Sequence, residues 1–160
     1  MSSNSSPKIL LFCYSYHTLS TKKLCEGIKQ KMSSIDLVLL KDGDGSMVTS
    51  DVDNYDYIGF ASGIYFWDYG KPIYEQVKKI GDFKGKKCFV LTTSGSASDR
   101  YNYYLREEIT KRNGNFVGGW GCKGYGNYFP LNLFGGSNPG KPDEMDIEKA
   151  CNFISGLISS

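Results

Sequence analysis

The sequence lacks the patterns on which several classes of protein depend. Its five cysteines are odd in number and widely spaced, and none forms a C-x-x-C pair for zinc binding or thiol exchange. A reducing compartment therefore fits better than a disulfide framework. Nineteen Lys and Arg against seventeen Asp and Glu leave a net charge of +2, with the basic residues scattered along the chain. This balance disfavours a nucleic-acid partner.

Long apolar runs are also missing. No stretch reaches about 18 unbroken apolar residues, the length that a membrane span needs. The opening Met-Ser-Ser-Asn-Ser-Ser-Pro has neither the cationic nor the apolar region of a signal peptide. We therefore expect a cytoplasmic protein without a membrane partner. Residues 1–6 are expected to form a disordered tail, and 7–160 a single domain.

Short apolar runs alternate with helical patterns. The expected strands cover 9–13, 35–40, 57–61, 88–92 and 116–122, and the expected helices cover 21–32, 71–80, a segment from about 99 to 112, and a segment from 143 onward. Five strands that alternate with helices predict an α/β fold, in which a parallel sheet carries helices on both faces.

Several residues mark where the helices begin and end. Ser20 or Thr21 is expected to cap the first helix, and Asp143 the last, with Asp146 in its first turn. Asn113-Gly114 is expected to end the third helix through its glycine, and Tyr104 to pack that helix against the core.

The loops after the first, third and fourth strands differ in chemistry. In a parallel sheet, ligands lie beyond the carboxyl ends of the strands. The first loop, 15–21, is rich in hydroxyls and precedes a helix N-terminus, which suits a phosphate. The other two loops, 62–67 and 93–96, combine glycine with aromatic or hydroxyl side chains, which suits a flat heterocycle. A phosphate beside a planar ring describes a mononucleotide.

Five segments together resemble the flavodoxin-like family, and more narrowly its small single-domain proteins. They are Tyr14–Lys23, Tyr55–Tyr65, Thr93–Gly95, Cys122–Gly124 and Gly135–Pro142. The resemblance spans nearly the whole chain, and it implies a three-layer sandwich whose five-stranded parallel sheet has the order 2-1-3-4-5. It also implies one FMN, bound non-covalently.

The resemblance places the two ends of FMN on this sequence. The phosphate end is expected at Ser15, Tyr16, His17, Thr18, Ser20 and Thr21. The ring is expected beside Ser62, Gly63, Ile64, Tyr65 and Phe66, with its pyrimidine edge at Thr93, Ser94, Gly95 and Ser96 and with Tyr101 within reach.

Two features depart from the family. Leu19 stands where the family usually has glycine, and Ser20 where it usually has asparagine. The charge of +2 also differs from the strongly acidic surface of flavodoxins that carry electrons. We expect an electron-transfer flavoprotein whose partner is a redox protein or a small-molecule acceptor, as a monomer or homodimer. The alternatives are an NAD(P)H-dependent FMN or quinone reductase and a non-enzymatic flavin-binding or regulatory module.

The segment 119–124 formally satisfies G-x-G-x-x-G but does not open a helix, so we reject it as a dinucleotide fingerprint.

Residues 123–142 have no regular pattern and form a segment longer than most connections between elements. Either they wall the flavin pocket or substrate entrance, or they cover the sheet edge. Cys122 is expected to be an inert core thiol.

Overall fold

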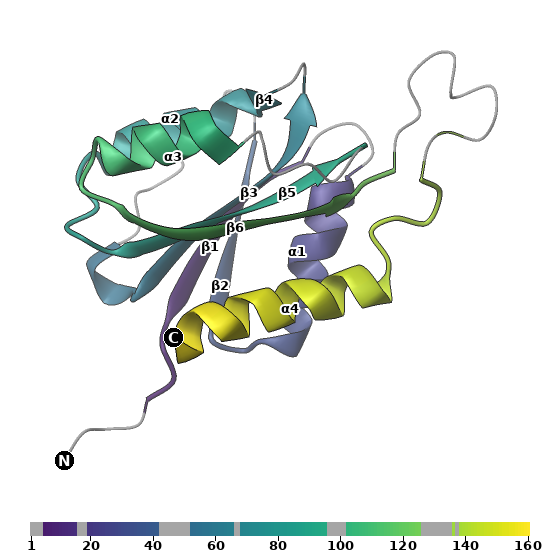
Figure 1. The fold of residues 1–160 in the computed structure, drawn as a ribbon, viewed down its shortest axis with the longest axis horizontal. Coiled ribbons are helices and arrows are strands. Elements are labelled where there is room, and N and C mark those ends of the chain that lie inside the picture. The colour runs from purple at the N-terminus through teal and green to yellow at the C-terminus, as the bar shows by residue number, and fades with distance from the viewer. Residues whose placement is uncertain are drawn as a thin grey trace.

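The protein is a three-layer α/β sandwich. The computed structural model describes residues 5–15, 19–41, 52–65, 68–95, 102–125, 136 and 138–160. The strands are β1 (Ile9–Tyr14), β2 (Ile35–Leu40), β3 (Tyr57–Tyr65), β4 (Asp68–Tyr69), β5 (Lys87–Ser94) and β6 (Asn115–Lys123). The helices are α1 (Ser20–Lys31), α2 (Lys71–Ile80), α3 (Asn102–Thr110) and α4 (Glu144–Ser159), with a 3-10 turn at Val52–Asn54. Figure 1 shows α2 and α3 over one face of the sheet and α1 and α4 over the other.

The sheet has the predicted topology with one addition. Its long strands are parallel and follow the order β2-β1-β3-β5-β6, which is the order 2-1-3-4-5 when only these five are numbered. The addition is the two-residue β4, which pairs antiparallel with the end of β3. The central strands β1, β3 and β5 therefore end at one edge of the sheet, as the predicted site requires.

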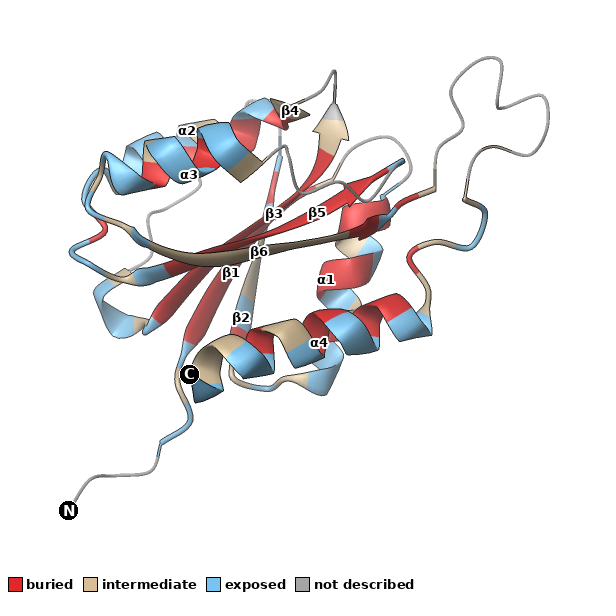
Figure 2. Ribbon diagram, viewed as in Figure 1, coloured by how far each residue is buried: buried red, intermediate tan, exposed pale blue. Residues whose placement is uncertain are grey.

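Two apolar clusters hold the layers together. The cluster under α1 and α4 contains Leu11, Leu24 and Phe89. The cluster under α2 and α3 contains Phe60 and Ile73. Figure 2 shows the buried residues concentrated along the central strands and on the helix faces turned toward them. Since β1 is buried at every position, its continuous apolar run matches that of a strand covered on both faces.

The last helix begins as predicted. Asp143 is its N-cap and accepts a hydrogen bond from the backbone N–H of Asp146, whose carboxylate accepts the N–H of Asp143 in return. The ammonium of Lys141 lies 2.9 Å from Asp143, and together with the cap it lowers the pKa of Asp143 to about 2. The start of α4 is thus fixed locally.

Three local predictions were wrong. Strand β3 continues past Ala61 to Tyr65, because β4 folds back and pairs with its end. Tyr104 is 63% exposed, because Leu105 and Ile109 are the residues of α3 that face the core. The turn after α3 uses a left-handed Asn113, with φ of 62°, and not a left-handed Gly114.

Candidate functional site

The carboxyl ends of β1, β3 and β5 bring the three predicted loops to one edge. Ser62 of β3 lies level with Tyr14 of β1 and Thr92 of β5, and Gly63 pairs with Thr93. Ser15 follows Tyr14 directly, so it lies one step further toward the same edge. Strand register therefore places the first and third predicted loops on either side of β3.

The N-terminus of α1 opens onto this edge. Its N-cap is Leu19, which has left-handed φ and ψ of 58° and 23° and makes no side-chain cap hydrogen bond. The prediction that Ser20 or Thr21 caps the helix was wrong, because both are already helical and buried. The first-turn N–H groups of a helix have no acceptors within the helix, and they form the positive end of its dipole.

The hydroxyls of Ser20 and Thr21 bind neighbouring parts of the protein. Thr21 Oγ1 lies 2.8 Å from Thr93 Oγ1 at the end of β5, and both residues are buried. Ser20 Oγ accepts the backbone N–H of Tyr125 at 3.1 Å. A Cβ on Gly124 would lie only 3.2 Å from the Cβ atoms of Ser20 and Thr93, so glycine permits this close approach. These contacts fix the start of α1 against the ends of β5 and β6.

Three buried hydroxyls near this edge make no hydrogen bond among the described residues. They are the Oγ atoms of Ser15 and Ser94, which lie outermost, and Oγ1 of Thr92, two residues further back in β5 than Ser94. An unpaired buried hydroxyl costs roughly 1–3 kcal/mol. Ser15 follows β1 and Ser94 ends β5, so two strand spacings of about 5 Å separate their chains along the edge. The edge thus presents two separate points that suit a polar ligand.

A relative has been found across the chain's full length. An uncharacterised protein of Methanocaldococcus jannaschii is 32% identical over 156 residues, which cover 96% of this chain and 99% of that protein. Flavodoxin 2 of Bacillus cereus aligns over 95% of this chain and 98% of its own, with a TM-score of 0.65 and 20% identity. The chain belongs to the M. jannaschii protein's family, and its fold is flavodoxin-like. No protein-family model matches the chain.

A flavoprotein of Lactobacillus acidophilus, crystallised in complex with FMN, shares the flavodoxin-like fold. It aligns over 72% of this chain and 93% of its own, with a TM-score of 0.60 and 18% identity. The predicted fold class and the flavodoxin-like resemblance are therefore confirmed. At these identities the solved structures establish the fold, and the ligand has to be argued from the residues of this chain.

The flavodoxin-like residues after β1 and β5 fit a phosphorylated ring compound. Ser15 follows β1 at the edge of the sheet where α1 also begins, so an anion there would meet a hydroxyl donor and the positive end of the helix dipole. Ser94 precedes Gly95, and no atom of the described residues lies within 4 Å of the position that a Gly95 Cβ would occupy. The site thus has an anion end and a roomy end, as a mononucleotide requires.

The predicted ring loop after β3 is largely strand. Ser62 is fully buried, its hydroxyl donates to Gly63 O at 2.6 Å, and it accepts the N–H of Gly70 at 3.0 Å. Gly63 is also buried, and Ile64 pairs with Tyr69 of β4. Of the predicted ring residues, Ser62 thus shapes the backbone, while Gly63 and Ile64 lie at the edge itself.

Some predicted residues lie outside the described part of the chain. They are Tyr16, His17, Thr18, Phe66, Ser96 and Tyr101. For Tyr65 the structure describes only the backbone, at the end of β3. Their proposed contacts with the ligand stay predictions.

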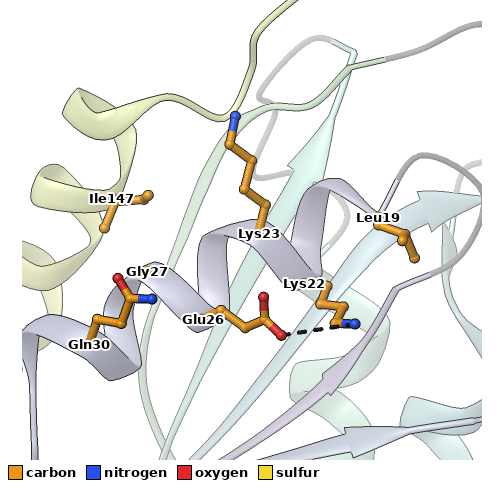
Figure 3. Close-up of a pocket in the computed structure, with 7 residues that line it drawn as sticks. All are labelled: Leu19, Lys22, Lys23, Glu26, Gly27, Gln30 and Ile147. Carbon is orange, nitrogen blue, oxygen red and sulfur yellow. Dashed lines mark ion pairs between the residues drawn. The ribbon is translucent and has the colours of Figure 1, made fainter.

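A groove between α1 and α4 lies beside the site. It has a volume of about 390 Å³ and is lined by Leu19, Lys22, Lys23, Glu26, Gly27, Gln30 and Ile147. Figure 3 shows Lys22 turned toward Glu26, at 3.9 Å, and the Lys23 ammonium directed toward the segment that precedes α4. Neither Ser15 nor Ser94 lines the groove, so it is a surface feature separate from the unpaired hydroxyls.

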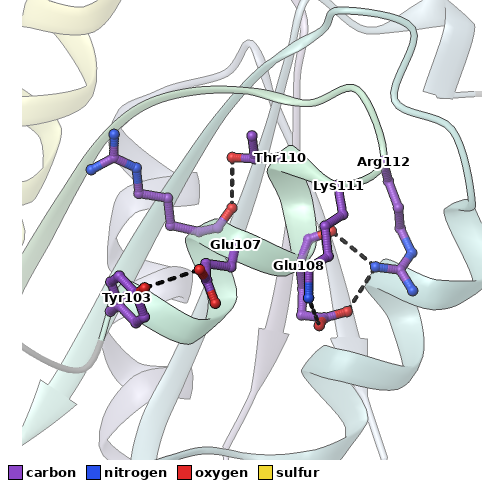
Figure 4. A network of polar contacts seen from close by, with 7 residues as sticks. Tyr103, Glu107, Glu108, Thr110, Lys111 and Arg112 are labelled. Carbon is purple, nitrogen blue, oxygen red and sulfur yellow. Dashed lines mark hydrogen bonds and ion pairs between the residues drawn. The ribbon is translucent and has the colours of Figure 1, made fainter.

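The outer surface of α3 carries a local polar network. In Figure 4, Tyr103 donates to Glu107 at 3.0 Å, and Arg112 binds Glu108 at 2.7 Å. Such pairs one turn apart contribute roughly 0.2–0.5 kcal/mol each. They stabilise the short helix that follows the third predicted loop.

Burial makes the thiol of Cys122, the cysteine near the site, unreactive. All five cysteines are free and buried. Burial raises the pKa of the Cys122 thiol to about 12, so little thiolate exists at neutral pH. The prediction of a core thiol at Cys122 is confirmed.

Residues 138–142 contribute contacts that the sequence-based site did not include. Asn138 donates to the carbonyl oxygens of Gly95 and Gly124, at 3.3 and 3.2 Å. Tyr125 N–H also donates to Lys141 O at 3.1 Å. Residues 123–142 have no regular pattern in the sequence, and no local signal shows that Asn138 contacts the residue after β5.

The conformation of Leu19 leads to a stability prediction. A left-handed conformation costs a residue with a Cβ about 1–2 kcal/mol, and leucine is also a poor N-cap. We expect the free energy of unfolding of Leu19→Gly to be about 1 kcal/mol higher than that of Leu19→Ala. This difference already allows for the greater entropy of glycine in the unfolded chain. Urea denaturation of both variants measures the difference. A glycine variant less stable than the alanine variant would contradict this conformation.

Proposed function

We propose that this protein binds FMN non-covalently at the carboxyl ends of β1, β3 and β5, and that it transfers electrons through the bound flavin. The proposal is carried by the hydroxyls of Ser15 and Ser94, which are buried and unpaired among the described residues. The likeness of the fold to that of a flavoprotein in complex with FMN supports it.

The two ends of the site would bind different parts of FMN. Ser15 and the first-turn N–H groups of α1 would hold the phosphate, because they combine a hydroxyl donor with the positive end of a helix dipole. Ser94 and Gly95 would hold the polar edge of the ring, and the open space at Gly95 would admit it. Bound FMN supplies one- and two-electron redox chemistry, and the protein orients it and limits the access of water.

The contacts behind the site keep these groups in place. The Thr21–Thr93 hydroxyl pair joins α1 to β5, so the phosphate end and the ring end cannot separate freely. Ser62 accepts the N–H of Gly70, the N-cap of α2, and thereby ties β3 to the start of α2. Both interactions are buried, so water does not compete with them.

The test is a titration of the purified protein with FMN and, separately, with riboflavin. We expect saturable quenching of FMN fluorescence with one site per chain, and binding of FMN at least about tenfold tighter than riboflavin, because only FMN presents a charged phosphate to Ser15 and α1. Absence of any spectral or fluorescence change with FMN would refute the proposal.

A second measurement separates the electron carrier from the reductase. The FMN-loaded protein is mixed anaerobically with NADPH, and the flavin absorbance is followed. A carrier keeps its oxidised spectrum until a stronger chemical reductant is added. Rapid bleaching by NADPH, followed by reoxidation with a quinone, would replace the carrier with an NAD(P)H-dependent reductase.

A further inference from the structure

One side chain connects two loops at the edge of the site. The amide nitrogen of Asn138 donates to Gly95 O, directly after β5, at 3.3 Å, and to Gly124 O, directly after β6, at 3.2 Å. Asn138 itself has a left-handed φ of 52°, a conformation that asparagine tolerates better than most residues. Its two amide protons therefore match two carbonyl groups from neighbouring strands.

Asn138 is presented by an anchored segment, residues 138–142, which we call the strap. The Lys23 ammonium of α1 donates to Gly140 O at 3.3 Å. Lys141 lies 2.9 Å from Asp143 and 3.3 Å from Asp146 at the start of α4. These contacts tie the strap to both helices on one face of the sheet. Asn138 is thus presented by a segment that has contacts of its own with α1 and α4.

The strap continues the network that fixes the start of α1. Gly124 N–H donates to Ser94 O at 3.0 Å, and Tyr125 N–H is shared between Lys141 O and Ser20 Oγ. Ser94 is also a residue whose buried hydroxyl has no partner among the described residues. The end of β5 is therefore held by two contacts. Thr21 of α1 binds Thr93, and Asn138 of the strap binds the carbonyl oxygen of Gly95.

We propose that Asn138 is a positioning residue that sets the ring end of the flavin site by fixing the backbone at Gly95. This proposal rests on the proposed function, because the ring end is defined by the ligand. Gly95 has no Cβ, and no described atom lies within 4 Å of the position that one would occupy, so the described residues pack little against its backbone. Without the amide of Asn138, the Gly95 carbonyl loses the hydrogen bond that joins it to the strap.

Three variants test the proposal. Asn138→Gly removes the amide and accepts the left-handed backbone, so it separates lost hydrogen bonds from backbone strain. Asn138→Asp keeps the size but turns a carboxylate oxygen toward two carbonyl oxygens. Asn113→Gly is the matched control, since Asn113 has φ of 62° and also donates through its amide, to Asp82 at 3.3 Å, but lies on the turn that leads into the start of β6.

The affinities for FMN and riboflavin are the first readout. We expect Asn138→Gly to weaken both ligands about tenfold, because two hydrogen bonds that position the shared ring are lost. Asn138→Asp is expected to weaken both further, and Asn113→Gly to leave both within about twofold of the original protein. Unchanged affinities in Asn138→Gly, or a loss confined to FMN, would overturn the proposal.

Amide hydrogen exchange of the ligand-free protein is the second readout. Asn138→Gly is expected to speed exchange at Gly124 and Tyr125, and Asn113→Gly to leave these amides unchanged. Faster exchange would support the positioning role even if FMN does not bind. In that case the proposed function is contradicted, and the positioning of Gly95 by Asn138 is not. Unchanged exchange at both amides in Asn138→Gly would overturn the positioning role itself.

Discussion

Replacement of Ser15 by aspartate is expected to weaken FMN binding about a thousandfold and to leave riboflavin binding nearly unchanged. The substitution places a carboxylate where the structure has a buried hydroxyl without a partner among the described residues, at the edge of the sheet where α1 begins. Two like charges about 4 Å apart repel by about 4 kcal/mol at the effective dielectric of a protein surface, which corresponds to about a thousandfold in affinity. Fluorescence titrations with the two ligands measure the effect.

Ser15→Ala is the matched control for this prediction. It removes the hydroxyl without adding charge, so FMN is expected to bind about ten- to a hundredfold more weakly, since a hydrogen bond to a charged group contributes roughly 1.5–3 kcal/mol. The alanine variant is expected to fold at least as stably as the original protein, because a buried hydroxyl without a partner is removed. Equal losses for FMN and riboflavin in Ser15→Asp would place the phosphate elsewhere.

Replacement of Phe60 by alanine is expected to lower the free energy of unfolding by about 4 kcal/mol. Phe60 is fully buried in the centre of β3, its ring stacks on Phe12 with centroids 5.6 Å apart, and it meets the edge of Phe83 at 6.1 Å. The alanine variant leaves a cavity bounded by rigid strands, which cannot close around it. Guanidinium denaturation followed by circular dichroism measures the loss.

The control for Phe60 is Tyr104→Ala on α3. The Tyr104 side chain is 63% exposed and makes an edge-to-face contact with Tyr103 at 5.5 Å. Its removal is expected to change the unfolding free energy by no more than about 0.5 kcal/mol. A loss as large as that of Phe60→Ala would mean that Tyr104 belongs to the core after all.

The sequence predicted the sheet well because burial on both faces leaves a local signal. The run Ile9 to Cys13 is apolar at every position, and the structure buries all of β1. The order of the strands came from the resemblance to a family and not from the runs themselves. The extension of β3 to Tyr65 was missed, because it depends on pairing with only two residues of β4.

The candidate site was predictable in its location but not in its internal contacts. Ser15 and Ser94 were placed by their positions after buried strands. The pairing of Thr21 with Thr93 joins residues 72 positions apart, and Asn138 meets Gly95 across 43 positions. Such contacts leave no periodic or local pattern. Leu19 was recognised as a departure from the family, but its left-handed conformation appeared only in the structure.

The five buried thiols allow the local opening of this fold to be measured. A thiol reagent labels a buried cysteine only when the surrounding structure opens, so the labelling rate counts those openings. Cys122 lies near the end of β6 beside the candidate site, whereas Cys88 lies near the start of β5, toward the opposite edge of the sheet. The labelling rates of these two native thiols therefore report the local opening of the two edges of one sheet.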